Sequence, residues 1–244
     1  MSSVAGSAGA DQFNEEALKR GVASVRHPLS RALLALTFTT GLVDAVSYLA
    51  LGRVFTANMT GNIVLLGFGI AGSGGLPVVA PLVSLGSFLM GAGVGGVLVK
   101  RIGPRHPVLI SCALGIEVSL LFMATVVAAA TTVEPGHASA YVLIVLMAFA
   151  MGVRNAVVRR IGVPDLTTTV LTMTLTGLAA ESKPAGGSGK GSARRIAAVL
   201  AMLLGALVGA LLLKTNVWLP LALAAVLALV TGLAYVPVAA RLGR

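Results

Sequence analysis

The sequence contains little charge for its length. Only 11% of its 244 residues are charged, whereas 57% are hydrophobic, and the mean hydropathy is +0.96. A soluble domain carries about 25% charged residues. The shortage of charge therefore excludes an ordinary soluble domain and indicates that lipid solvates most of the chain.

Cysteine is almost absent and histidine is sparse. The single cysteine, Cys112, excludes an internal disulfide and a cysteine-based zinc cluster. The histidines lie at the ends of apolar runs, at positions His27, His106 and His137, which disfavours a metal site. Neither an ATP-binding motif nor a nucleophile with a nearby base is present. We therefore expect no cofactor, no metal and no enzymatic activity.

The first residues lack the apolar segment of a cleavable signal peptide. Residues 1–27 are small, polar and charged, and we expect a disordered cytoplasmic tail. The Gly/Ser-rich stretch SKPAGGSGKGS, residues 182–192, predicts a flexible loop. The remaining chain predicts one membrane domain made of two repeats, residues 28–131 and 138–241.

Long apolar runs dominate the remaining chain. Each is near the roughly 20 residues that span a bilayer as a helix, which predicts an all-α, multi-pass integral membrane protein. These runs are residues 32–52, 77–99, 107–130, 139–158, 196–213 and 217–236. Two further apolar segments, 54–72 and 163–180, are shorter and more polar.

The Lys and Arg residues favour one topology. If all eight apolar segments cross, the two sides hold ten and eight basic residues, which is no bias. If residues 54–72 and 163–180 each enter and leave on one face, the split becomes sixteen to two, with only Arg53 and Lys214 outside. Cytoplasmic loops carry such an excess. We therefore predict six transmembrane helices, two re-entrant or broken segments and cytoplasmic termini. Because orientation explains the net charge of +10, nucleic acid is not an expected partner.

The chain also resembles itself. GLVDAV at 41–46 matches GVRNAV at 152–157, and GAGVGGVLVK at 91–100 matches GALVGALLLK at 205–214. With three crossings in each copy, the second repeat is inverted relative to the first. Inverted repeats with interrupted helices at matching positions indicate a transporter site near the bilayer midplane. The small-residue spacings at Gly91 and Gly205 predict helix-packing surfaces.

Two polar motifs are candidate binding sites for a small polar solute. In VFTANMTGN, the side chains of Asn58, Thr60 and Asn62 offer donors and acceptors, although Asn58 is equally suited to cap a helix. The second motif, VPDLTTTVLTMT, predicts a helix start capped by its aspartate. Its threonines are equally suited to bond the preceding helical turn. Its candidate ligands are Asp165, Thr168, Thr169 and Thr172.

Ionisable residues within the apolar runs are candidates for ion or proton coupling. Asp44 and Glu117 lie deep in their runs, where ionisable residues usually face a partner or a cavity. Arg154 and Asn155 occupy the corresponding level of the second repeat, with Asn155 matching Asp44. Two alternatives stay open: a structural pair of Asp44 with Arg154, and a protonated Glu117 bonded to a backbone carbonyl.

The two motifs together resemble a known family. GLVDAVSYLALGRVFTANMTGN followed by GVRNAVVRRIGVPDLTTTVLTMTLTG is similar to the YoaK family of bacterial multi-pass membrane proteins, a domain of unknown function. The resemblance covers essentially residues 30–240 and implies an inner-membrane protein without adding a substrate. The family often has Thr-Gly-Thr where this chain has Thr172-Met173-Thr174, so close backbone approach in the second motif is not implied.

Three functions remain as hypotheses. The leading one is a secondary transporter or channel for a small polar or anionic solute. The rivals are a membrane-embedded enzyme acting on a lipid-soluble substrate and a structural or assembly protein. The expected partners are the lipid bilayer and the solute, and a homo-oligomer is left open.

Overall fold

The computed structural model describes residues 28–103, 107–161 and 171–242, and within these ranges the chain forms helices and no strand. The predicted tail, residues 1–27, lies outside them. The long helices are α2 (Pro28–Ala50), α4 (Val79–Ile102), α5 (Pro107–Ala130), α6 (Ala138–Ile161), α8 (Ser192–Leu213) and α9 (Trp218–Leu242). The short ones are α3 (Met59–Ile70) and α7 (Leu171–Ala180), with single 3-10 turns η1 (Ser73–Gly75) and η2 (Lys183–Ala185).

The long helices confirm the prediction of six membrane-spanning segments. Within the described residues, six helices are long and apolar enough to cross a bilayer. Helices α3 and α7 have 12 and 10 residues, or about 18 and 15 Å at 1.5 Å per residue. A hydrocarbon core is about 30 Å thick, so neither short helix crosses it alone.

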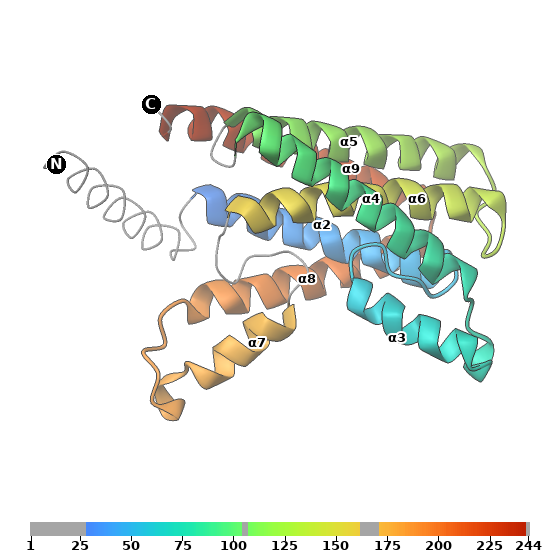
Figure 1. Cartoon of the computed structure of the whole chain (residues 1–244), viewed down its shortest axis with the longest axis horizontal. Coiled ribbons are helices and arrows are strands. Elements are labelled where there is room, and N and C mark those ends of the chain that lie inside the picture. The colour runs from blue at the N-terminus through green and yellow to red at the C-terminus, as the bar shows by residue number, and fades with distance from the viewer. Residues whose placement is uncertain (1–27, 104–106, 162–170, 243–244) are drawn as a thin grey trace, which may run out of the picture.

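The long helices pack mainly in pairs, of which α4–α6 and α2–α8 run parallel and α5–α9 runs antiparallel (Figure 1). Helix α4 packs along α6, α2 along α8 and α5 along α9, and further contacts join α5 to α6 and α2 to α9. The short helices lie beside this bundle, α3 on α4 and α7 on α8 (Figure 1). Helices α2 and α6 are central, because 67% and 61% of their apolar windows are buried, against 17% to 33% in the other long helices.

Because glycine has no side chain, the backbones of α2 and α8 come into direct contact at two glycines. A Cβ atom on Gly41 of α2 would lie 2.4 Å from the carbonyl oxygen of Met202, and one on Gly205 of α8 would lie 2.1 Å from that of Phe38. Both distances are too short for any side chain. The prediction that the spacing at Gly205 is a packing surface is confirmed.

Helices α4 and α6 make the corresponding contact. A Cβ atom on Gly91 would lie 2.2 Å from the carbonyl oxygen of Phe149, and one on Gly152 would lie 2.2 Å from that of Phe88. The predicted packing surface at Gly91 is likewise confirmed. Gly41 and Gly152 differ by 111 positions, and Gly91 and Gly205 differ by 114, which are the offsets between the matching sequence segments.

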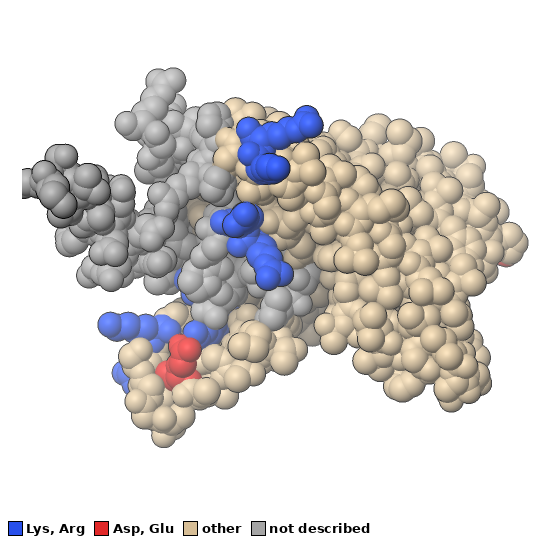
Figure 2. Space-filling model, in the orientation of Figure 1, with Lys and Arg blue, Asp and Glu red and all other residues tan. Residues whose placement is uncertain are grey.

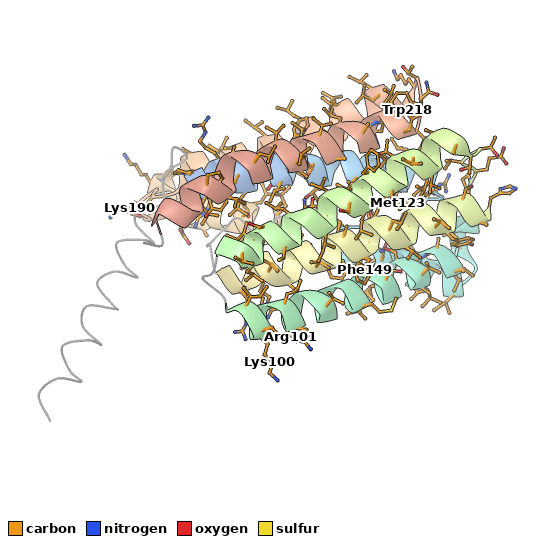
Figure 3. The ribbon with its side chains drawn as sticks, turned by 90° about the horizontal axis from the view of Figure 1, so that it is seen from above. Lys100, Arg101, Met123, Phe149, Lys190 and Trp218 are labelled. Atoms are coloured by element: carbon orange, nitrogen blue, oxygen red, sulfur yellow. The ribbon has the colours of Figure 1, made fainter. Side chains whose placement is uncertain are left out.

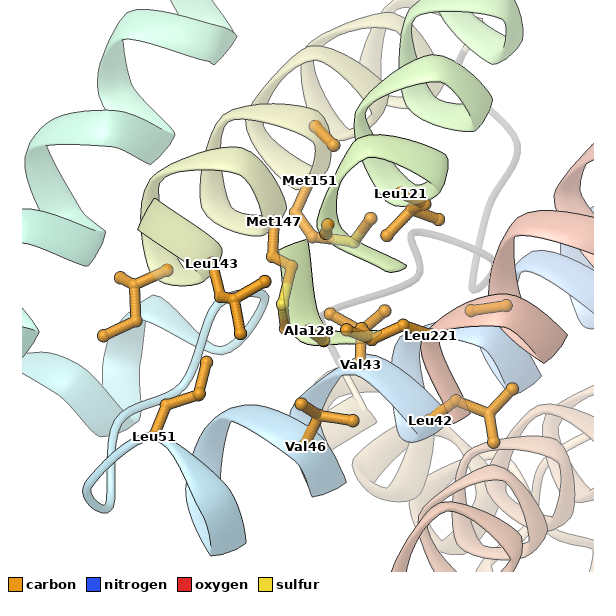
Figure 4. Packing of buried hydrophobic residues seen from close by; sticks show 14 of the residues in the cluster. Leu42, Val43, Val46, Leu51, Leu121, Ala128, Leu143, Met147, Met151 and Leu221 are labelled. Carbon is orange, nitrogen blue, oxygen red and sulfur yellow. The ribbon is translucent and has the colours of Figure 1, made fainter. Parts of the chain in front are cut away.

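The apolar core lies between α2, α5, α6 and α9. Leu42, Leu121, Met147 and Leu221 are fully buried at its centre, as Figure 4 shows. Because each comes from a different helix, burial of these side chains fixes the four helices against one another. The polar side chains described below are held within this arrangement.

Basic side chains gather at one end of the bundle, on the face seen in Figure 2. We call the end where α2 begins and α9 ends the basic end. Lys100, Arg101 and Lys190 lie there, whereas Trp218 lies at the opposite end (Figure 3). Arg53 lies three residues after Ala50, the end of α2 that is remote from the basic end. The bundle is therefore electrostatically asymmetric along its axis.

Candidate functional site

The stretch 54–62 is an extended segment whose backbone is bonded by side chains. The Phe55 N–H donates to Asn62 Oδ1 at 2.9 Å, and Asn62 Nδ2 donates to the Phe55 carbonyl oxygen at 2.6 Å. The hydroxyl of Ser84 on α4 donates to the same carbonyl at 2.6 Å. Buried backbone groups outside regular structure need such partners. Asn62, which is fully buried, therefore holds the loop onto α3 and α4.

Asp44 holds the next two residues of the same segment. Its Oδ1 atom accepts the backbone N–H groups of Thr56 at 3.3 Å and Ala57 at 3.0 Å. Asp44 is 6% exposed, and its Oδ2 atom has no hydrogen-bond partner among the described residues. The same holds for the hydroxyl of Thr56. Two buried polar atoms close to the start of α3 are thus left without a hydrogen-bond partner among the described residues.

The rest of the first motif shapes the start of α3. Asn58 Oδ1 accepts the Gly61 N–H at 3.3 Å, which makes Asn58 the N-cap of the helix. A Cβ atom on Gly61 would lie 2.8 Å from the Phe55 ring, so only glycine fits there. Thr60 is exposed. The side chains of Asn58 and Asn62, two of the three predicted ligand residues, thus form hydrogen bonds to the protein's own backbone.

The second motif is described only in part. The predicted ligand residues Asp165, Thr168 and Thr169 lie outside the described residues. Thr172 is exposed on α7, and its carbonyl oxygen accepts the hydroxyl of Thr176 at 2.9 Å. A threonine hydroxyl bonded to the preceding helical turn is the alternative to ligand binding that the sequence left open for the threonines of this motif.

A buried ion pair joins α5 and α6. Arg154 Nη1 donates to Glu117 Oε1 at 2.8 Å, with side chains 2% and 0% exposed. The sequence left open a pair of Arg154 with Asp44 and a Glu117 bonded to a backbone carbonyl. The carboxylate that the Arg154 guanidinium contacts belongs to Glu117. The two partners are 37 positions apart in the sequence, so it is the packing of α5 against α6 that brings them together.

Two threonines of α2 complete this central cluster, defined as Thr39, Thr40, Glu117 and Arg154. Arg154 Nη1 donates to the Thr39 hydroxyl at 3.0 Å, and Nη2 donates to the Thr40 hydroxyl and approaches the Met151 sulfur. Both threonine hydroxyls in turn donate to the Leu36 carbonyl oxygen, at 2.8 and 2.9 Å. Sequence analysis missed the threonines, although the polar run TFTT (37–40) in an apolar segment is a signal.

The central cluster lies near the middle of the bundle's length. Glu117 is ten residues from the start of α5, or about 15 Å along a helix of about 36 Å. Asp44 is closer to the opposite end, six residues or about 9 Å before the end of α2 at Ala50. Asn155 is partly buried beside the cluster and donates to the Met151 carbonyl oxygen at 2.8 Å.

Two atoms of the ion pair keep unused hydrogen-bonding capacity. Glu117 Oε2 and Arg154 Nε are buried and have no hydrogen-bond partner among the described residues. An unsatisfied buried polar group costs about 1–3 kcal/mol, and more when it is charged. Such groups point to a bound molecule, water or proton at this position.

A small apolar cavity adjoins the ion pair on the side of the basic end. Glu117 and Arg154 line it together with side chains of α2, α5, α6 and α9, which include Leu33, Leu114, Val158 and Tyr235. The lining side chains lie between the basic end and the middle of the bundle. Anywhere in the described ranges, no group of three His, Cys, Asp or Glu residues is placed to hold a metal ion.

The six long apolar helices and the charges buried among them define a multi-pass helical membrane protein. The model of the family described as "Protein of unknown function (DUF1275)" matches residues 32–234, and the chain belongs to that family. The chain is similar to the "UPF0700 transmembrane protein YoaK" of Bacillus subtilis (strain 168), with 37% identity over 147 residues. That match spans 60% of this chain and 64% of the relative. No solved structure matches the chain.

Proposed function

We propose that the protein is a secondary transporter or channel for a small polar or anionic solute, and not an enzyme. The observation that carries the proposal is the Glu117–Arg154 pair, which is buried at mid-depth, keeps two atoms without a hydrogen-bond partner among the described residues and adjoins a small apolar cavity. Ionisable residues inside a membrane are costly and mark solute, ion or proton pathways. The proposed location is the bacterial inner membrane, with the basic end and both termini cytoplasmic.

An inverted-repeat architecture is part of the proposal. Helices α2 to α5 correspond to α6 to α9, and the helix contacts occur in matching pairs. The α2–α8 contact corresponds to α4–α6, the α2–α9 contact to α5–α6, and the α3–α4 contact to α7–α8. The glycine contacts match in the same way. Folds of this kind alternate access around a fixed central site.

In this proposal, α3 and α7 belong to two segments that enter and leave the membrane on the same face. Figure 1 shows α3 beginning part-way along the bundle and running back to the end where α4 starts, with α7 arranged similarly towards the basic end. Non-helical backbone at membrane depth is tolerated where protein surrounds it. The bonds from Asp44 and Asn62 to residues 55–57 meet that requirement. The pathway would continue from the central cluster past Asp44 Oδ2 and the Thr56 hydroxyl.

Transport is tested by comparing solutes taken up by vesicles. Inverted membrane vesicles with the protein, without it and with the double variant Glu117→Gln/Arg154→Gln would be incubated with a metabolite extract. Mass spectrometry would then quantify their contents. We expect at least one solute to accumulate only with the unsubstituted protein. Identical contents in all three preparations, under imposed proton and sodium gradients, would reject transport.

A further inference from the structure

The pairing of Arg154 with Glu117 leaves Asp44 without a basic partner. Arg154 attracts Asp44 through space, but its guanidinium is bonded to Glu117 within the central cluster. Both hydrogen bonds to Asp44 come from uncharged backbone N–H groups, and the described residues form no ion pair with it. Since the charges of Glu117 and Arg154 cancel, an ionised Asp44 would leave an uncompensated negative charge in the protein interior.

The other titratable groups around α2 do not supply a countercharge. Helix α2 packs against α8 and α9, and residues 51–58 fold back along its end. Helix α3, which starts beside this segment, carries no titratable side chain. The remaining described titratable side chains of these elements are exposed, lie at the basic end or line the cavity: Arg31, Tyr48, Arg53, Arg194, Arg195, Lys214 and Tyr235.

From this charge balance we propose that Asp44 is a reversible proton-binding site and that Thr56 is its positioning residue. The proposal rests on the proposed function and names the coupling ion of that transporter as a proton. An isolated carboxylate is costly to bury, and a proton removes its charge. Uptake forms an O–H bond at Oδ2 with a proton from solvent. Release breaks that bond and returns the proton to solvent.

The contacts of Asp44 suit both of its protonation states. The oxygen of a carboxylate and the carbonyl oxygen of a carboxylic acid both accept N–H groups, so the bonds from Thr56 and Ala57 to Oδ1 persist in either state. Oδ2 and the buried Thr56 hydroxyl are both without a hydrogen-bond partner among the described residues. A hydroxyl donates to an ionised oxygen and accepts from a protonated one. Thr56 can therefore serve Asp44 in both states.

The alternatives to a proton on Asp44 have less support. Glu117 is a poorer carrier, because Arg154 already neutralises its charge. A metal ion would also neutralise Asp44, but a hard cation is bound by about six oxygen atoms. The side chains around Asp44 leave two oxygens without a partner, Oδ2 and the Thr56 hydroxyl. A proton needs only Oδ2.

Infrared difference spectroscopy on the full chain in lipid nanodiscs detects such a proton, because a carboxylic acid away from water has a carbonyl stretch at high frequency. Spectra would be recorded between alkaline and acidic buffers, in sodium and in choline salts. We expect a high-frequency band that appears on acidification, at the same pH in both salts, and disappears on return to alkaline buffer. Asp44→Asn, which keeps an acceptor for both N–H groups, should lack this band. The double variant Glu117→Gln/Arg154→Gln should keep it.

Variants of Thr56 test the positioning role and keep the inference testable if Asp44→Asn does not fold. Thr56→Val removes the hydroxyl but keeps the side-chain shape and the backbone N–H that donates to Asp44. We expect the band to shift in frequency, because the acid loses its hydrogen-bond partner. Thr56→Ser, which restores a hydroxyl, should return the band to its original position. Thr60→Val is the control, because the exposed Thr60 should leave the band unchanged.

The inference is overturned if no high-frequency band titrates, if the band survives in Asp44→Asn, or if Thr56→Val leaves it in place. Loss of the band in sodium salts would also overturn it and would assign a metal ion to Asp44. These readouts involve no flux. A titrating Asp44 band without solute accumulation in vesicles would sustain the proton site and reject transport. Solute accumulation by a protein that lacks this band would do the reverse.

Discussion

At the scale of single residues, Asp44 acts on the backbone that follows α2. Its Oδ1 atom accepts two N–H groups, while Arg154 contacts Glu117. Asp44→Asn keeps an acceptor for both N–H groups, so we expect normal folding and insertion, with transport or its pH dependence lost. Asp44→Leu leaves both N–H groups unsatisfied and should cost about 1–3 kcal/mol for each. Melting temperatures in detergent and solute uptake would be measured on the same preparations.

The opposite behaviour of the asparagine variant would show a different role for Asp44. If Asp44→Asn unfolds and the addition of Arg154→Gln restores its melting temperature, Asp44 neutralises Arg154 and serves only the fold.

Asn62 and Thr60 differ in their expected effects although they lie two residues apart. Asn62→Ala removes the partner of the Phe55 N–H and should lower the free energy of unfolding by about 1–3 kcal/mol. The exposed Thr60 is its control, because Thr60→Ala should change stability by no more than about 0.5 kcal/mol. Chemical denaturation in mixed micelles measures both values. Equal, small effects would contradict the structural role given to Asn62.

The ion pair is best tested by substitution of one and then both partners. Glu117→Gln or Arg154→Gln alone leaves a buried charge unpaired and should cost about 3–5 kcal/mol. The double variant should recover most of this loss. A melting-temperature cycle over the four proteins gives the coupling, and additive single effects would show that the two side chains do not interact.

At the scale of helices, stability depends on which glycines face another backbone. Gly91 faces the Phe149 carbonyl oxygen, whereas a Cβ atom on Gly93 of the same helix meets no atom within 4 Å. Gly91→Ala should cost about 1–3 kcal/mol through overpacking. Gly93→Ala should be neutral or slightly stabilising, because alanine is the better helix former. Thermal unfolding compares the two, and the reverse order would contradict the observed α4–α6 contact.

At the scale of the whole molecule, the basic end sets the proposed orientation. Arg101 is exposed near that end, and Glu134 is exposed in the turn between α5 and α6 at the other. In a Cys112→Ser background, we expect a membrane-impermeant maleimide to label Glu134→Cys in intact cells and to label Arg101→Cys only after lysis. Labelling of Arg101→Cys from outside would favour eight crossings over six.

The sequence by itself determined the elements but not the partners of the buried charges. Hydropathy predicted the six long helices because lipid demands an apolar surface along each helix. Local chemistry also predicted the packing surface at Gly91 and offered the cap at Asn58 as an alternative to ligand binding. The contacts of Arg154 were decided only by tertiary structure. Thr39 is 115 residues away and Glu117 is 37, so helix packing, and no local pattern, brings them together. The cavity beside this pair has the same origin, since its walls come from four helices.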